Sequence, residues 1–308
     1  MKRRQFIQRL GMGSIFLGSG IISPNVFANP SMFKLTILHT NDTHSRIDPF
    51  PMDGGSNQGL GGVARRAALI KKIRKEEQNV LLLDSGDTFQ GTPYFNLFGG
   101  EIEFKTMSAM GYDASTMGNH DFDAGLEGFV KQLPHASYPF ICSNYDFTDT
   151  PIHDKTQPFK IIKKGDIKIG LFGLGVELDG LVPKDGFGNT KYLDPIEKAQ
   201  YYAKFLKHDQ KCDMVICLSH LGYKYNSDKI DDIKLAKNTE NIDIILGGHT
   251  HTFLSKPDVQ LNLKGDKTII NQVGFAGIVL GRLDVFLEKN KKGVCVSCNN
   301  HEINNLIG

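Results

Sequence analysis

The chain of 308 residues has few cysteines, no surplus of charge of one sign, and only one long apolar stretch. Five cysteines, an odd number, are too few for a disulfide scaffold. The 36 basic and 34 acidic residues leave a formal net charge of +2, and no basic block is longer than residues 71–75, so nothing points to nucleic-acid polymers as partners. Beyond the N-terminus, no apolar segment is long enough to cross a bilayer. These absences favour one large domain with its own hydrophobic core.

The N-terminal stretch has the pattern of an export signal. Basic residues precede a Gly-interrupted apolar segment, and Val26-Phe27-Ala28 has the small-residue pattern of a cleavage site. The paired Arg3 and Arg4 resemble a bacterial twin-arginine signal, with an ordinary secretory peptide as the alternative. We therefore expect residues 1–28 to be a signal peptide and residues 29–308 to be exported to the periplasm.

Five short polar motifs each follow an apolar run of strand length. They are Asp42-Thr43-His44 after residues 35–38, Asp87 after 80–83, Asn119-His120 after 114–117, His220 after 215–218, and His249-Thr250-His251 after 242–246. Helical patterns alternate with such runs, which is typical of a layered α/β fold. Because loops after the carboxyl ends of strands in an open α/β sheet gather at one edge, we expect these motifs to converge there.

Other segments carry local signals for helices, strands and loops. The helical patterns cover Val63–Gln78, Phe104–Met110, Leu126–Leu133, Pro195–His208 and Asp228–Asn238. Asp194-Pro195 is a good helix start, with Pro in the first turn. Residues 268–273 and 277–287 are expected to be two antiparallel-type strands joined by Gly274-Phe275-Ala276. The Gly-rich stretch Asp48–Gly62 is expected to be a flexible loop that can line or cover a site.

The motif residues offer oxygen and imidazole ligands without thiolate. Such a set suits Zn, Mn, Fe or Co in a hydrolytic site better than a closed structural zinc site. In Asp42-Thr43-His44 the outer side chains are expected on the same side of an extended backbone, where both can bind one ion, and His249-Thr250-His251 repeats that geometry. Seven ligands suit two divalent ions bridged by one carboxylate, for which Asp87 is our choice. Two such ions neutralise the oxygens of a phosphate ester and support in-line attack on phosphorus.

His120 stands apart from this set because Asn119 already supplies a ligand from the same loop. Its imidazole is free for the substrate, and Asp123 could orient it. The resulting His–Asp pair would stabilise developing charge or protonate the leaving oxygen.

The remaining polar residues have structural explanations. Asp84 is expected to stabilise a loop, and Cys142 and Cys217 to be core residues. Cys295-Val296-Ser297-Cys298 has zinc-like spacing but no second pair nearby, so we expect no metal role there. The histidines without a motif partner, expected to be structural or exposed, are His39, His135, His153, His208 and His301.

Two segments resemble the signatures of the calcineurin-like metallophosphoesterases, and within them of the bacterial 5′-nucleotidase/UDP-sugar hydrolase group. These are Leu38–His44 and Gly118–Asp123, and the similarity covers about residues 33–287. The resemblance implies a four-layer α/β-β/α sandwich. It also implies one ion held by Asp42, His44, Asp87 and His251, another held by Asp87, Asn119, His220 and His249, substrate contacts from Asn119 and His120, and a catalytic pair of His120 and Asp123.

The chain departs from that group in two ways. Asp121 stands where the group usually has Glu, and we expect little effect because the residue is not a ligand. The group's enzymes also carry a C-terminal domain whose aromatic side chains clamp the base, whereas this chain stops at Gly308. The resemblance thus implies a single catalytic domain without the nucleotide-binding domain, which a separately encoded partner would supply.

The sequence therefore predicts an exported two-metal phosphohydrolase that cleaves phosphate monoesters, above all nucleoside 5′-monophosphates. A cyclic-nucleotide or nucleotide-sugar phosphodiesterase and a sulfur-ester hydrolase are alternatives that the metal site alone does not separate. A metal-free scaffold subunit is the alternative outside the enzyme class, and the intact ligand set argues against it.

Overall fold

The computed structural model describes residues 32–288 and 295–307, so the expected signal peptide over residues 1–28 lies outside the described part. The first of two large sheets contains β1 (Met32–Thr40), β2 (Val80–Asp84), β3 (Ala114–Ser115), β12 (Val279–Glu288), β13 (Cys295–Cys298) and β14 (His301–Glu302). Its order is β13-β12-β1-β2-β3, with β14 beside β12. Strands β1, β2 and β3 run parallel, whereas β12 is antiparallel to β1.

The second large sheet is built around four parallel strands. It contains β5 (Phe159–Lys164), β6 (Ile167–Leu174), β8 (Met214–Ser219), β9 (Ile244–Gly247), β10 (Asp258–Leu261) and β11 (Lys267–Asn271), in the order β10-β11-β9-β8-β6-β5. The edge strands β10 and β5 are antiparallel to their neighbours. A small separate ladder joins β4 (Tyr145–Asp146) to β7 (Lys191–Tyr192).

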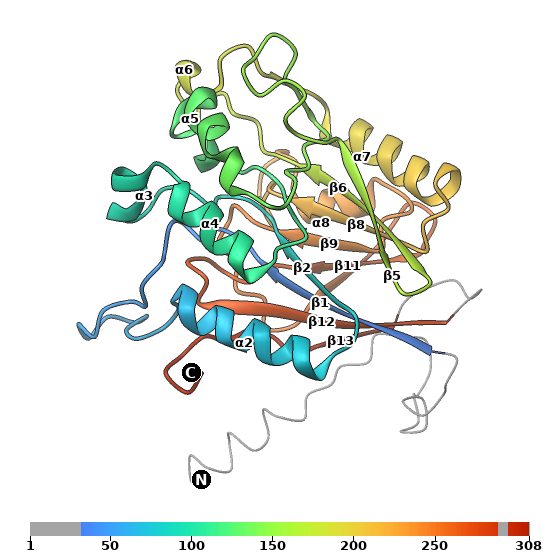
Figure 1. The fold of residues 1–308 in the computed structure, drawn as a ribbon. Helices are drawn as coiled ribbons and strands as arrows, with labels where there is room; N and C mark the ends of the chain where they lie inside the picture. Colours follow the sequence, from blue (N-terminus) through green and yellow to red (C-terminus); the bar gives the residue numbers. More distant parts are fainter. Residues whose placement is uncertain (1–31, 289–294, 308) are drawn as a thin grey trace.

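Side chains alternate between two hydrophobic layers along the central strands, because successive residues of a strand face opposite sides. In β1, Leu35 points between the two sheets, whereas Leu38 joins a cluster beneath the helices. In β8, Ile216 points between the sheets, and Cys217 packs beneath the helices of the other side. The layers therefore run helix, sheet, sheet, helix, and the expected four-layer sandwich is confirmed (Figure 1).

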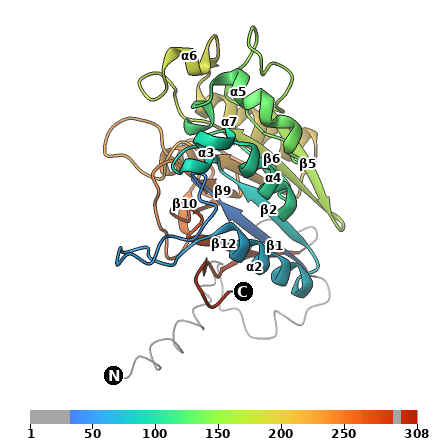
Figure 2. The ribbon, with the colours of Figure 1, turned by 60° about the vertical axis from the view of Figure 1, so that its left-hand side comes forward.

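The outer layers are helices whose apolar faces cover the sheets (Figures 1 and 2). Over the first sheet lie α2 (Val63–Glu76), α4 (Glu101–Met110) and α5 (Gly125–Gln132), and over the second lie α7 (Pro195–Lys204) and α8 (Asp232–Lys237). The Asp194 side chain caps α7 by accepting a hydrogen bond from the Glu197 N–H. All five predicted helices are present, although the last begins at Asp232 rather than Asp228.

Shorter helical segments form the connections. They are α3 (Pro93–Phe98), α6 (Lys184–Phe187), the 3₁₀ turns η2 (His120–Phe122) and η3 (Leu133–His135), and the π-helical turn η4 (Phe205–Asp209) that continues α7. Within residues 32–288 and 295–307, no helix combines the length and apolarity needed to cross a bilayer.

The two antiparallel-type strands predicted near the C-terminus are both present, but they lie in different sheets. Strand β11 pairs with β9 and β10 in the second sheet, whereas β12 pairs with β1 and β13 in the first. Gly274-Phe275-Ala276 therefore carries the chain from one sheet to the other rather than forming a hairpin. Each strand does have an antiparallel neighbour, which explains why its local pattern resembles half of a hairpin.

Candidate metal centre

The carboxyl ends of strands from both sheets bring the sequence motifs to one edge of the molecule. Asp42 and His44 follow β1, Asp87 follows β2, Asn119 follows β3, His220 follows β8, and His249 and His251 follow β9. Six of these seven side chains form two groups, and the ligand atoms of each group lie within 4.8 Å of one another. The sandwich thus places two candidate ion sites side by side where its two sheets meet solvent.

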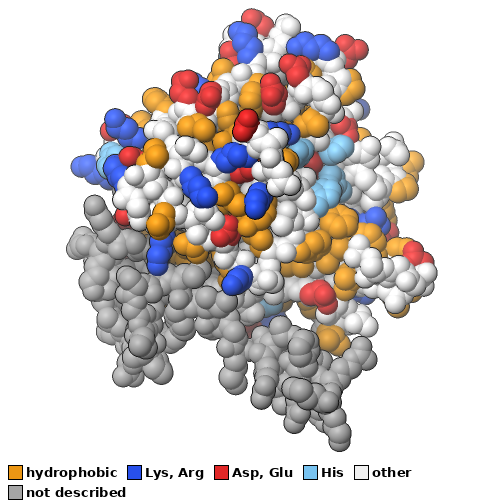
Figure 3. Space-filling view, turned by 180° about the vertical axis from the view of Figure 1, so that it is seen from behind, with side chains coloured by type: hydrophobic (Ala, Val, Ile, Leu, Met, Phe, Trp, Pro, Cys, Tyr) orange, Lys and Arg blue, Asp and Glu red, His pale blue; other side chains and the backbone are white. Residues whose placement is uncertain are grey.

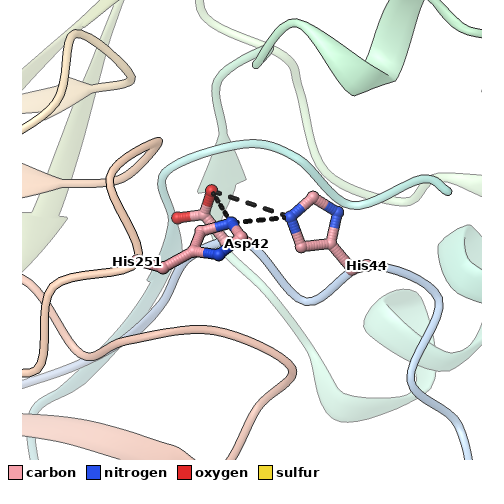
Figure 4. A group of neighbouring side chains, drawn as sticks. All are labelled: Asp42, His44 and His251. Atoms are coloured by element: carbon pink, nitrogen blue, oxygen red, sulfur yellow. Dashed lines mark hydrogen bonds and ion pairs between the residues drawn. The ribbon is translucent and has the colours of Figure 1, made fainter. Parts of the chain in front are cut away.

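The first cluster consists of Asp42, His44 and His251 (Figure 4). The Nε2 atoms of His44 and His251 are 2.9 Å apart, and they lie 3.9 Å and 3.4 Å from Oδ1 of Asp42. Asp42 is fully buried, whereas the His251 side chain is 41% exposed. Figure 4 shows both imidazole rings directed toward the carboxylate, an arrangement that suits one ion with an open side.

The second cluster consists of Asp87, His220 and His249. Nε2 of His220 lies 3.1 Å from Oδ2 of Asp87, and both side chains are buried. The same Asp87 oxygen lies 3.9 Å from Nε2 of His44 in the first cluster. Asp87 therefore stands between the two clusters, the position that a bridging carboxylate requires.

Asn119 adjoins the second cluster through its neighbours in the chain. The N–H of His120 donates to Oδ1 of Asp87 at 2.8 Å, and a Cβ on Gly118 would collide with the same oxygen. Oδ1 of Asn119 is buried and lacks a hydrogen-bond partner among the described residues. A buried polar atom without a partner is costly, and a divalent ion bound to the cluster would supply one. The donor set therefore fits metal ions.

Backbone carbonyl groups orient two of the imidazole rings. Nδ1 of His220 is 2.6 Å from the Ser85 carbonyl oxygen, and Nδ1 of His44 is 3.2 Å from that of Phe89. A ring that donates from Nδ1 keeps the lone pair on Nε2 for an ion. Ser85 and Phe89 flank Asp87 in the chain, so one loop fixes ligands of both clusters.

In the second cluster, Asp87 and His220 form a buried pair of opposite charge. Burial lowers the pKa of His220, but the Asp87 carboxylate beside it prevails and raises that pKa to about 10. Burial raises the pKa of Asp87, but His220 outweighs it and holds the pKa well below its usual range. Burial lowers the pKa of His249 to about 4, which keeps this imidazole neutral and able to bind a metal.

The ligand loops have a backbone that differs from the extended one we expected. Asp42 and His44 have positive φ angles of 50° and 47°, and Asp87 has 55°. Such angles are strained for residues other than glycine and persist where the surroundings impose them. Asp42 and His44 do share a cluster, but left-handed turns rather than an extended segment bring their side chains together.

The local prediction that His249 and His251 lie on the same side of an extended backbone and bind one ion is also wrong. His251 joins Asp42 and His44, whereas His249 joins Asp87 and His220. Both histidines have positive φ, 72° and 51°, so the backbone turns between them. The two histidines therefore belong to different clusters.

Asp121 organises the loops that carry the second cluster, a role that sequence reasoning missed. Its buried carboxylate accepts backbone hydrogen bonds from Asp87, Thr88, Phe89 and Gly118 at 2.8–3.3 Å. It thereby ties the loop after β2 to the loop after β3. Its place directly after Asn119-His120 is visible in the sequence, but these long-range donors are not.

His120 lies at the open side of the centre. Its Nδ1 is 2.7 Å from Oδ2 of Asp123, and its ring centroid is 5.3 Å from that of His44. The side chain is 40% exposed. The hydrogen bond to Asp123 raises the pKa of His120, which favours a protonated imidazole facing solvent. His120 therefore borders the clusters without belonging to either of them.

The residues given structural explanations have structural surroundings. Asp84 accepts hydrogen bonds from Thr40 and Gly86, so its role in stabilising a loop is confirmed. Cys142 and Cys217 are buried in the core as expected. His39 is fully buried against Gly281, 2.8 Å from the Asn271 side chain.

Comparison with known proteins places these features in a family. Residues 35–253 match the family described as calcineurin-like phosphoesterase. The chain is 37% identical over 229 residues to snake venom 5′-nucleotidase of Gloydius brevicauda, covering 72% of this chain and 38% of that protein. It is 32% identical over 295 residues to the trifunctional nucleotide phosphoesterase protein YfkN of Bacillus subtilis, covering 85% of this chain and 18% of that protein.

A solved structure shows the same architecture. The 5′-nucleotidase precursor from Thermus thermophilus aligns with a TM-score of 0.82 and 30% sequence identity over 90% of this chain and 56% of that one. This chain thus spans well under two thirds of the length of these proteins. The fold, the two clusters and these similarities agree, and the chain belongs to the calcineurin-like phosphoesterase family.

Proposed function

We propose that this protein is a two-metal phosphohydrolase that cleaves phosphate monoesters, with nucleoside 5′-monophosphates as substrates. The observation that carries the proposal is the position of Asp87 between two clusters of ligands. The name of the Gloydius brevicauda relative supports the choice of 5′-nucleotides. The ions that fit are Zn, Mn, Co or Fe, because the ligands are carboxylate, amide oxygen and imidazole.

The seven ligands divide between two ions. Asp42, His44 and His251 would hold one, His220, His249 and Asn119 the other, and Asp87 would contact both. When bound, the ions neutralise phosphate oxygens and promote attack on phosphorus. The protein supplies the orientation, since Ser85, Phe89 and Asp121 fix the ligand loops.

His120 and Asp123 would act on the substrate. The His120 side chain is 40% exposed beside His44, and its Nδ1 is 2.7 Å from Oδ2 of Asp123. A protonated His120 can donate a hydrogen bond to a phosphate oxygen and a proton to the leaving oxygen. Asp123 would keep the imidazole protonated and oriented. Asn119 would contact the substrate from the same loop.

Hydrolysis of nucleotide diesters is a second candidate function. The Bacillus subtilis relative is named a trifunctional nucleotide phosphoesterase, which favours a site open to more than one kind of ester. Cyclic nucleotides and nucleotide sugars are the substrates to compare with AMP.

The proposal extends to location and organisation. The paired arginines and the cleavage pattern support export of residues 29–308 to the periplasm by the twin-arginine route. The relatives' greater length supports a further substrate-binding domain that acts together with this catalytic unit. Replacing both Arg3 and Arg4 by Lys should leave the precursor in the cytoplasm. Normal export of that variant would contradict export by the twin-arginine route.

Phosphate release by the purified protein tests the activity. AMP and an aryl phosphate are supplied with Mn, Co or Zn, and again with a chelator. Metal-dependent release that favours AMP supports a nucleotidase, and turnover of the aryl phosphate alone supports a catalytic unit that needs its specificity domain. Two bound ions without hydrolysis of either ester would contradict the proposed monoesterase and turn attention to diesters. A protein that binds no metal would instead be a scaffold subunit.

A further inference from the structure

Gln272 follows β11 directly and lies beside the loop that carries His249 and His251. Strand β11 runs parallel to β9, and Asn271 pairs with Leu246. Gln272 is the next residue along the chain, so it adjoins the carboxyl end of β9, where the loop begins. Its side chain is fully buried, although it is polar. A buried carboxamide needs hydrogen-bond partners, and the loop over residues 248–252, here called the histidine loop, supplies them.

The Gln272 carboxamide contacts the histidine loop at three points. Nε2 donates to the Gly248 carbonyl oxygen. Oε1 accepts from the Thr250 hydroxyl at 3.0 Å and from the Thr252 N–H at 2.6 Å. A backbone carbonyl only accepts and a backbone N–H only donates, so these partners determine which end of the carboxamide carries the oxygen. The contacts thus lie before, between and after the two histidines.

Gln272 is itself held by bonds that do not depend on the histidines. Its carbonyl oxygen accepts from the Leu254 N–H at 3.1 Å. The next residue, Val273, donates its N–H to the Asn41 side chain at 3.0 Å. Because Asn41 directly precedes Asp42, the segment around Gln272 is also tied to the loop of the first cluster. The carboxamide is therefore a fixed support for the histidine loop.

The two histidines adopt a backbone conformation that needs such a support. Both have positive φ, which is strained for residues with side chains and persists where the surroundings impose it. The His249 N–H donates to both oxygens of Asp42 at 3.0 Å, a contact that holds the first histidine only. Gln272 contacts the loop on both sides of each histidine. Figure 3 shows exposed histidine side chains gathered on one face of the molecule.

We infer that Gln272 is a positioning residue that directs His249 to one ion and His251 to the other. The inference rests on the proposed two-ion centre and deepens it, because His249 belongs to the second cluster and His251 to the first. Gln272 acts only through the backbone and the Thr250 hydroxyl of the histidine loop. Without its three contacts the loop can relax from the strained angles, and both imidazoles then leave their ions. Loss of Gln272 should therefore weaken both sites together.

Gln272→Leu tests the inference, because leucine has a similar size and makes none of the three hydrogen bonds. Both ions are expected to bind about 10- to 100-fold more weakly, the scale for loss of a group that orients metal ligands. Calorimetric titration of metal-depleted protein with Mn or Zn measures the two affinities. Gln132→Leu, which changes a buried glutamine on α5, is the matched control and should leave both affinities as in the wild type.

Thr250→Val and Thr250→Ser test the same contact if Gln272→Leu does not fold. Valine has the shape of threonine but cannot donate to Gln272, whereas serine keeps the hydroxyl. Thr250→Val should weaken both ions by about tenfold, and Thr250→Ser should bind them as the wild type does. The hydroxyl also accepts from the Tyr223 N–H at 3.0 Å, in the loop after β8 that carries His220. Weakening of the second ion alone would therefore point to Tyr223 and overturn the role of Gln272.

Other results would also overturn the inference. Unchanged affinities in Gln272→Leu, or a loss at one site alone, would show that Gln272 does not direct both histidines. An equal loss in Gln132→Leu would show that general stability sets the affinities. Failure of the proposed function is distinguishable from these results. Wild-type protein that binds two ions and hydrolyses no ester contradicts the function, whereas the affinities of the variants still decide the role of Gln272.

Discussion

The two clusters meet solvent differently. In the first, the His251 side chain is 41% exposed and stacks on Phe275, whereas in the second both Asp87 and His220 are buried. The second cluster is held through Ser85, Asp121 and the N–H of His120, and the first through Phe89, the Asn41 side chain and the N–H of His249. If both clusters bind ions as proposed, this difference in exposure predicts that the buried cluster retains its ion and that the open one exchanges its ion and receives substrate.

Asp87→Asn should abolish the difference between the clusters, because one oxygen of Asp87 lies 3.1 Å from Nε2 of His220 and 3.9 Å from Nε2 of His44. We expect both ions to bind poorly and kcat/KM to fall by at least about 10³-fold, the upper range for loss of one electrostatic group. Metal analysis after dialysis and AMP hydrolysis measure the effect. Asp53→Asn, in the exposed loop, is the control. Retention of both ions in the Asp87 variant would show that the bridge is assigned wrongly.

His120→Ala should leave metal binding at both clusters intact and lower only the rate of catalysis. We expect unchanged metal content and a kcat lowered by roughly 10²–10⁴-fold, the scale of a general acid–base group. Steady-state kinetics and metal analysis on the same preparation are the measurements. Loss of an ion in this variant would make His120 a ligand instead.

A comparison of His220→Ala with His251→Ala should show different losses of metal affinity at the two clusters. Removing buried His220 should weaken the second ion by about 100-fold or more, whereas removing exposed His251 should weaken the first by about tenfold, since an open site can recruit water. Calorimetric titration with Mn or Zn measures both affinities. Equal losses in the two variants would contradict the difference between a retained and an exchanging ion.

Asp123→Asn should have the smallest effect, because it acts only through His120. The hydrogen bond from His120 to Asp123 raises the pKa of His120, so its loss should lower that pKa. If protonated His120 is the active form, the alkaline limb of kcat moves to lower pH, and kcat at its optimum falls about tenfold, less than for loss of the imidazole. An alkaline limb at the same pH in the variant and in the wild type would show that Asp123 does not raise the pKa of His120.

The sequence predicted the features that local patterns determine. Apolar runs such as those of β1 and β2 identified buried parallel strands, and the polar residues after them identified the edge where ligands meet. Long-range features were missed for a physical reason. The positive φ angles at Asp42 and His249, the four donors that meet Asp121, and the separate sheets of β11 and β12 all depend on neighbours distant in the chain.

Stepwise titration of metal-depleted protein with Mn or Zn, read by calorimetry and by phosphate release from AMP, tests the central claim of two ions acting together most directly. The account predicts binding of two equivalents with different affinities, and activity that rises only with the second. Full activity after one equivalent, or saturation at one, would contradict a two-ion centre.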